Sequence, residues 1–122
     1  MSAPENFEFT ATETLRQQAL GLPNTVEGES CVNRAFSAGG KNFAFVGERK
    51  GRCTLRLKLG PSVAELSARA ERDGERYQVG SAGWTLVTFA PDDPPPAEES
   101  ATWIEESYRL LVPAKAQVPT NE

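Results

Sequence analysis

The sequence predicts an α+β domain of two layers, in which helices pack on one face of a mostly antiparallel sheet of about five strands. Two observations carry this prediction. Short segments that alternate between apolar and polar residues are joined by Gly-containing turns, as in antiparallel hairpins. Segments with apolar residues at helical spacing stand before, between and after them, in the order α-β-β-β-α-β-β-α, without the regular crossovers of a parallel sheet.

The first half of the chain is expected to form one helix and then a hairpin. Residues 10–13 (TATE) have the spacing of a helix capping box, and the helix should run to about residue 20, where Gly and Pro stop it. Strands are expected at 32–36 and 42–46. The pair of glycines at 39–40 supplies the positive φ that a tight turn between them needs.

The clearest pattern in the sequence is the alternation over residues 52–59 (RCTLRLKL). One face of this predicted strand carries Cys53, Leu55, Leu57 and Leu59. The other face carries Arg52, Thr54, Arg56 and Lys58. A period of two residues predicts a strand with one face on a core and the other in water.

The second half is expected to form a helix from residue 61 to about 73, strands at 76–79 and 84–89, and a last helix between 96 and 113. The segment 91–96 (PDDPPP) cannot be helical, because residues before proline adopt extended geometry. The last helix has an apolar stripe made of Trp103, Ile104, Tyr108 and Leu111.

Length and targeting features favour one small domain. We expect a flexible leader at 1–9, a single domain at 10–113 and a frayed tail at 114–122 in this chain of 122 residues. No apolar run reaches the roughly 18 residues of a membrane span, and the acidic start lacks the apolar segment of a signal peptide. We therefore expect a cytoplasmic protein without membrane contact.

The chain contains no histidine, which excludes Ser-His-Asp and Cys-His catalysis and imidazole metal ligands. The carboxylate pairs at 92–93, 98–99 and 105–106 lie in a linker or a helix, where we expect them to be solvated. Cys31 and Cys53 are expected to be reduced and buried. No catalytic set is visible, so we expect a non-enzymatic protein without cofactor or metal.

Five segments together resemble the MmcQ/YjbR-like family. They are 22–27 (LPNTVE), 36–44 (FSAGGKNFA), 55–58 (LRLK), 83–84 (GW) and 104–110 (IEESYRL). Each segment alone is weak evidence for the family, but their order and spacing match the family's motifs from about residue 10 to 115.

The resemblance implies a small bacterial protein whose α+β fold is similar to secretion chaperones and to the CyaY superfamily, with DNA binding through a double-wing arrangement. The chain departs from the family's pattern at two places. Residues 31–34 (CVNR) replace a frequent W-G-H-P, and Ala82 replaces a frequent histidine before the GW.

The formal net charge of −4 conceals three segments of different sign. Residues 1–33 carry a net −4, residues 34–76 a net +5, and residues 77–122 a net −5. DNA-binding domains are usually strongly basic, so the average charge does not favour nucleic acid, whereas the central segment does.

The candidate nucleic-acid contacts are the cations of the predicted hairpin at 49–58: Arg49, Lys50, Arg52, Arg56 and Lys58. A basic wing of this kind could follow a phosphate backbone or enter a groove, and it would bind duplex DNA weakly and with salt dependence. The competing interpretation is a solvated strand face, on which Lys and Arg prevent edge pairing. Both interpretations remain open at this point.

Large aromatic residues make a second candidate surface, for a protein partner or a small apolar ligand: Trp84, Trp103 and Tyr108. Because they fall on apolar faces of a predicted strand and helix, core packing is the favoured interpretation for them.

Overall fold

Six strands and three α-helices make up the part of the chain that the computed structural model describes, residues 7–30, 33–90 and 96–119. The helices are Phe7–Leu20 (α1), Val63–Arg72 (α2) and Ala97–Leu111 (α3). The strands are Val26–Ser30 (β1), Asn33–Ala38 (β2), Lys41–Arg49 (β3), Arg52–Lys58 (β4), Tyr77–Val79 (β5) and Trp84–Phe89 (β6). Single 3-10 turns occur at Ser81–Gly83 and Ala114–Gln117.

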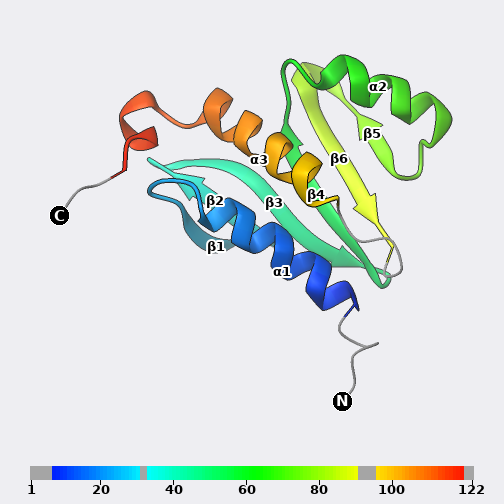
Figure 1. Cartoon of the computed structure of the whole chain (residues 1–122), viewed down its shortest axis with the longest axis horizontal. Helices are drawn as coiled ribbons and strands as arrows, with labels where there is room; N and C mark the ends of the chain where they lie inside the picture. Colours follow the sequence, from blue (N-terminus) through cyan, green and yellow to red (C-terminus); the bar gives the residue numbers. More distant parts are fainter. Residues whose placement is uncertain (1–6, 31–32, 91–95, 120–122) are drawn as a thin grey trace.

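The strands form one antiparallel sheet in the order β1-β2-β3-β4-β6-β5. In Figure 1, α1 and α3 lie side by side in front of the sheet, and α2 packs beside β5. The predicted α+β fold with helices on one face is confirmed, with six strands in place of about five. Among the described helices, none is long and apolar enough to cross a membrane.

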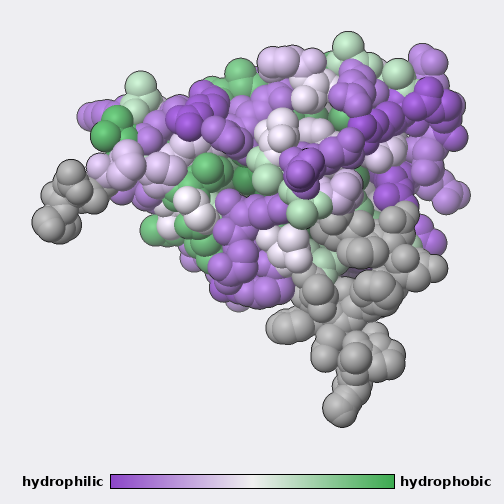
Figure 2. Space-filling view, viewed as in Figure 1, coloured by the Kyte–Doolittle hydropathy of each residue, from purple (hydrophilic) through white to green (hydrophobic). Residues whose placement is uncertain are grey.

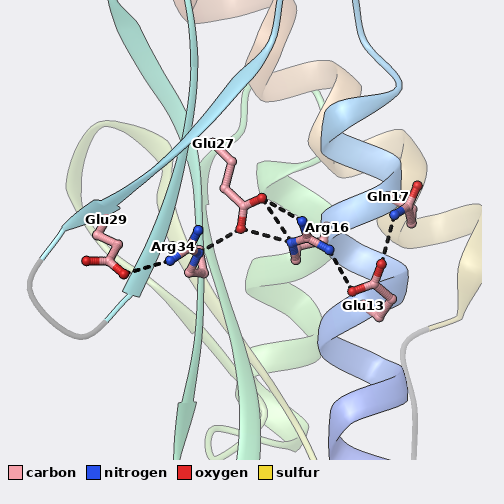
Figure 3. Close-up of polar contacts among 6 residues, drawn as sticks. All are labelled: Glu13, Arg16, Gln17, Glu27, Glu29 and Arg34. Carbon is pink, nitrogen blue, oxygen red and sulfur yellow. Dashed lines mark hydrogen bonds and ion pairs between the residues drawn. The ribbon is translucent and has the colours of Figure 1, made fainter.

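The additional strand is β1, whose sequence VEGES has no apolar alternation. It pairs with β2, and Glu27 occupies the position opposite the buried Phe36, on the helix side of the sheet. Figure 3 shows how this carboxylate is accommodated: Arg16 of α1 lies 2.8 Å from it and Arg34 of β2 lies 2.7 Å from it. An edge strand anchored by ion pairs lacks the apolar periodicity on which sequence-based prediction depends.

The core lies between the sheet and the helices and is formed by the residues that the periodicity predicts. Leu55 and Leu57 of β4 are fully buried, as are Leu15 of α1 and Leu66 of α2. From α3 the stripe Trp103, Ile104 and Tyr108 enters this core. The helical and strand periods of the sequence therefore identify the core correctly.

A β-bulge changes the direction of the side chains in the middle of β3. The register with β2 shifts between Phe36 and Ser37, so that β3 has one extra residue at Phe43. As a result Phe43 and Ala44 are both buried, although they are neighbours in the chain. Phe43 packs edge-on against Tyr108 of α3, with ring centroids 5.1 Å apart. Beyond the bulge, Phe45 is only partly buried and lies opposite Arg56 on β4.

Helix α1 begins at Phe7, three residues before the predicted start, so residue 10 lies within the helix and not at its N-cap. The Glu13 carboxylate instead accepts hydrogen bonds from Arg16 and Gln17 within the helix. Cys53 is buried as expected, and the Thr12 hydroxyl lies 3.6 Å from its Sγ. Cys31 lies outside the described residues.

Part of the segment expected to fray is packed against the domain. The turn Ala114–Gln117 follows Pro113, and the carbonyl oxygen of Ala116 accepts hydrogen bonds from the Asn24 amide at 2.9 Å and from the Tyr108 hydroxyl at 3.2 Å. The single proton of the Tyr108 hydroxyl is shared with the carbonyl oxygen of Pro23, which is the nearer acceptor at 2.7 Å. These long-range contacts hold the segment, and its local sequence gives no sign of them.

One acidic residue of α3 caps the start of α2. The Glu106 carboxylate accepts hydrogen bonds from the backbone N–H of Gly60 (2.7 Å), the N–H of Ser62 (2.9 Å) and the Ser62 hydroxyl (2.7 Å). Glu99 similarly binds Arg69 of α2, at 2.8 Å. The expectation of simply solvated carboxylates is therefore wrong for these two residues, and the pair at 92–93 lies outside the described residues.

Replacing Glu106 with alanine should lower the free energy of unfolding by about 1.5 kcal/mol, because the start of α2 loses its acceptor. Urea unfolding followed by circular dichroism measures this change. The matched control is Glu105→Ala, which removes only the surface pair with Arg109 and should change stability by less than about 0.5 kcal/mol. Equal effects of the two substitutions would contradict the capping role.

Candidate functional site

The face of the sheet opposite the helices is the candidate site. None of the helices in the described ranges covers it. The other side of the molecule, where the helices lie, shows mainly hydrophilic residues with only small hydrophobic areas (Figure 2). On β4 the residues of this face alternate with the core residues, as the sequence predicts. We call it the open face and define it by Phe45, Arg52, Thr54, Arg56, Lys58, Gln78, Trp84, Leu86 and Thr88.

The centre of the open face is apolar and aromatic. Phe45 of β3 and Leu86 of β6 lie opposite Arg56 of β4, one on each side. The rings of Phe45 and Trp84 are 6.5 Å apart between centroids and tilted by 46°. The Arg56 guanidinium carbon lies 5.2 Å from the centroid of the Trp84 ring, a cation–π distance. Arg56 therefore adds a positive charge to an aromatic pair.

Three open hollows cover this face. The largest, of about 590 Å³, lies at the β3–β4 turn and is lined by Arg49, Lys50, Arg52, Thr54, Glu75, Gln78, Leu86 and Thr88. The second, of about 550 Å³, includes Arg56, Trp84 and Leu86. The third, of about 370 Å³, includes Phe45, Arg56 and Leu86. Since Leu86 lines all three, the hollows adjoin each other and form one continuous surface.

The cations of this surface differ from those of the helix side in their partners. On the helix side, carboxylates neutralise Arg16, Arg34, Arg69 and Arg109. The five predicted contact residues make no ion pair with any carboxylate in the described residues: Arg49, Lys50, Arg52, Arg56 and Lys58. Glu75 lines the hollow at the β3–β4 turn, and the Glu48 carboxylate accepts a hydrogen bond from the Thr12 hydroxyl at 2.9 Å. Among the described residues, neither carboxylate forms an ion pair with the five cations. As far as the described residues show, the open face thus presents cations that no ion pair occupies.

The five cations are distributed along the hairpin rather than gathered at one point. Arg49, Lys50 and Arg52 line the hollow at its tip, and Arg56 lines the two others. Lys58 lies at the far end of β4, opposite Trp84, and lines none of the three hollows. The turn itself has a positive φ at Lys50 (54°) and Gly51 (76°), which turns the chain within two residues.

The three predicted aromatic residues do not form a common surface. Trp103 is 3% exposed and Tyr108 is fully buried, so core packing is correct for both. Core packing is wrong for Trp84, which is only partly buried on the open face while its neighbour Thr85 points inward.

Phe45 is the second aromatic residue of the open face, in place of Trp103 and Tyr108. The alternation of a strand around Ala44 and Val46 was the signal that could have identified it.

Within the described ranges, no three His, Cys, Asp or Glu side chains come together in a way that could hold a metal ion. No protein of curated function is similar enough to this chain to be matched to it. A family model described as YjbR matches residues 20–110, most of the chain.

The chain belongs to the YjbR family. The match to the YjbR model runs from the end of α1 to the last turn of α3 and so includes all of the open face. Two segments that carry the sequence resemblance meet there: residues 55–58 contribute Arg56, and residues 83–84 contribute Trp84.

Proposed function

We propose that this YjbR-family protein is a non-enzymatic nucleic-acid-binding protein whose open face contacts phosphate groups. The observation that carries the proposal is the set of five cations at 49–58, which no carboxylate in the described residues neutralises. Proteins obtain most of their sequence-independent affinity for DNA from such contacts. The contacts to the phosphates position the nucleic acid and do not read its sequence.

The separation of charge between the two sides is compatible with an acidic protein that binds a polyanion. Glu27, Glu99 and Glu106 are held by partners on the helix side, away from the open face. At physiological salt the Debye length is about 8 Å, so charges across the two layers are largely screened. The net charge of −4 still opposes binding at long range, and we therefore propose a weak and strongly salt-dependent affinity.

Fluorescence anisotropy with labelled duplex DNA at about 50 and 200 mM salt tests this proposal. The double substitution Arg52→Ala and Arg56→Ala should weaken binding about tenfold or more at the lower salt. It should also reduce the slope of log affinity against log salt by about two, close to one for each lost phosphate contact.

The matched control is Arg72→Ala with Arg109→Ala, which changes the net charge equally but removes exposed cations of α2 and α3. It should leave the salt slope unchanged. Absence of binding at about 50 mM salt, or equal losses in the two double variants, would overturn the proposal.

The alternative function is binding of a protein partner or a small apolar molecule. The observation that favours it is that Trp84 and Leu86 are partly exposed and line the same hollow of about 550 Å³. An apolar ligand would shift the fluorescence of Trp84 and not that of the buried Trp103, and it would still bind the Arg52→Ala, Arg56→Ala variant. Nucleic acid would lose affinity for that variant.

A further inference from the structure

We propose that the open face prefers single-stranded nucleic acid to duplex, because bases stack on the Phe45–Trp84 pair. This inference rests on the proposed function and specifies its ligand. The starting observation is that two large aromatic side chains lie on a sheet face that no described helix covers, 6.5 Å apart between ring centroids. Apolar side chains that are exposed together on a surface are typical of binding sites, and phosphate contacts alone would require only the cations.

The neighbours of the pair form an apolar floor with a charged centre. Phe45 on β3 and Leu86 on β6 stand on either side of Arg56, and Trp84 lies under the Arg56 guanidinium at 5.2 Å. Both rings are partly exposed. Single-stranded bases are bound on sheets in this way, by stacking on aromatic rings and on the planes of arginine guanidinium groups.

The cations of β4 are placed to follow the backbone of such a strand. Arg52, Arg56 and Lys58 all point to the open face, because they are separated by even numbers of residues. Along a β-strand the seven residues from Arg52 to Lys58, six steps apart, span about 20 Å. This length corresponds to a short site, at the lower end of the roughly 4 to 16 nucleotides that single-strand-binding folds cover.

A duplex cannot use the aromatic pair in the same way. Its bases are already stacked on one another, and turning one outward costs a few kcal/mol. A broad sheet face reaches only the phosphates of a duplex, so Phe45 and Trp84 would stay without contact to bases. A single strand can satisfy both the cations and the rings, which is the physical reason for the preference.

The test compares the full chain with labelled oligothymidylate of about 12 nucleotides and with a duplex of the same length, at about 50 mM salt. The single strand should bind about tenfold more tightly. Phe45→Leu, which keeps an apolar side chain but removes the ring, should weaken single-strand binding about tenfold and leave duplex binding unchanged. Unfolding by urea checks that the variant is folded.

A second measurement uses the fluorescence of the wild-type chain, with Trp84→Phe as its control. Trp103 is 3% exposed, so quenching of tryptophan fluorescence by oligothymidylate reports on Trp84. Trp84→Phe keeps an aromatic ring for stacking and should retain affinity while the quenching disappears.

The outcomes separate the two proposals. Equal affinities for single strand and duplex, no effect of Phe45→Leu, or no quenching in the wild-type chain would each overturn the stacking inference. If the stacking inference is overturned but the duplex still binds through Arg52 and Arg56, the proposed phosphate-binding function is still supported. If neither nucleic acid binds, both proposals are overturned.

Discussion

Replacing Gly83 with alanine is expected to lower the free energy of unfolding by about 3 kcal/mol. Gly83 has a φ of +83°, a conformation that side chains rarely adopt, and a Cβ at this position would overlap the carbonyl oxygen of Leu59. The obstacle is backbone, and the Leu59 N–H donates to the Gly83 carbonyl oxygen at 2.9 Å. The end of β4 therefore cannot move away without breaking this hydrogen bond.

Gly40 provides the matched control. It has the same φ of +83°, but no atom lies within 4 Å of the position that its Cβ would occupy. Gly40→Ala should cost only the conformational strain, about 1 kcal/mol. Urea unfolding of the two variants measures the difference, which isolates the contact with Leu59. A loss for Gly83→Ala no greater than for Gly40→Ala would refute the role of this contact.

Replacing Glu27 with glutamine is expected to lower the free energy of unfolding by about 2 kcal/mol at neutral pH. The side chain is 12% exposed and ties three elements together through Arg16 of α1 and Arg34 of β2 (Figure 3). Removing its charge leaves the two guanidinium groups without their shared partner. The control is Glu29→Gln, since Glu29 pairs with the same Arg34 but is 75% exposed, and should change stability by less than about 0.5 kcal/mol.

The same residue predicts a pH dependence. Hydrogen bonds from Arg16, together with one from Arg34, lower the pKa of Glu27 from 4.5 to about 2. Because the pKa is lower in the folded chain, the contribution of Glu27 is complete above its unfolded pKa and is lost as the pH falls from about 5 to 2. The difference in unfolding free energy between wild type and Glu27→Gln should shrink over this range. A difference independent of pH would contradict the assignment.

The prediction of the fold from sequence succeeded where side-chain periodicity and burial coincide. In β4 the two-residue period identifies both the buried Leu55 and Leu57 and the exposed Arg52 and Arg56. The prediction failed for β1. There Glu27 faces the helix side because it pairs with Arg16 of α1 and Arg34 of β2. Ion pairs between different elements leave no apolar periodicity in the sequence.

The sequence indicated which cations of β4 share the open face, but not which aromatic residues lie there. In β6 both faces offer apolar residues, so the sequence cannot decide whether Trp84 or Thr85 points inward. The structure buries Thr85, whose hydroxyl donates to the carbonyl oxygen of Gly83 at 3.0 Å, and leaves Trp84 on the open face. The segment between β5 and β6 contains the 3-10 turn Ser81–Gly83, with positive φ at Ala82 and Gly83.

The sequence by itself determined the α+β class, the core stripes of the helices and the basic character of the 49–58 hairpin, because these follow from periodicity and composition. Only the tertiary structure decided which aromatic residues are available to a ligand. The bulge at Phe43 directs that ring into the core and leaves Phe45 on the open face, and packing against the sheet buries Trp103 and Tyr108. The physical reason is that side-chain direction in a strand depends on its register with neighbouring strands, and register depends on residues far away in the chain.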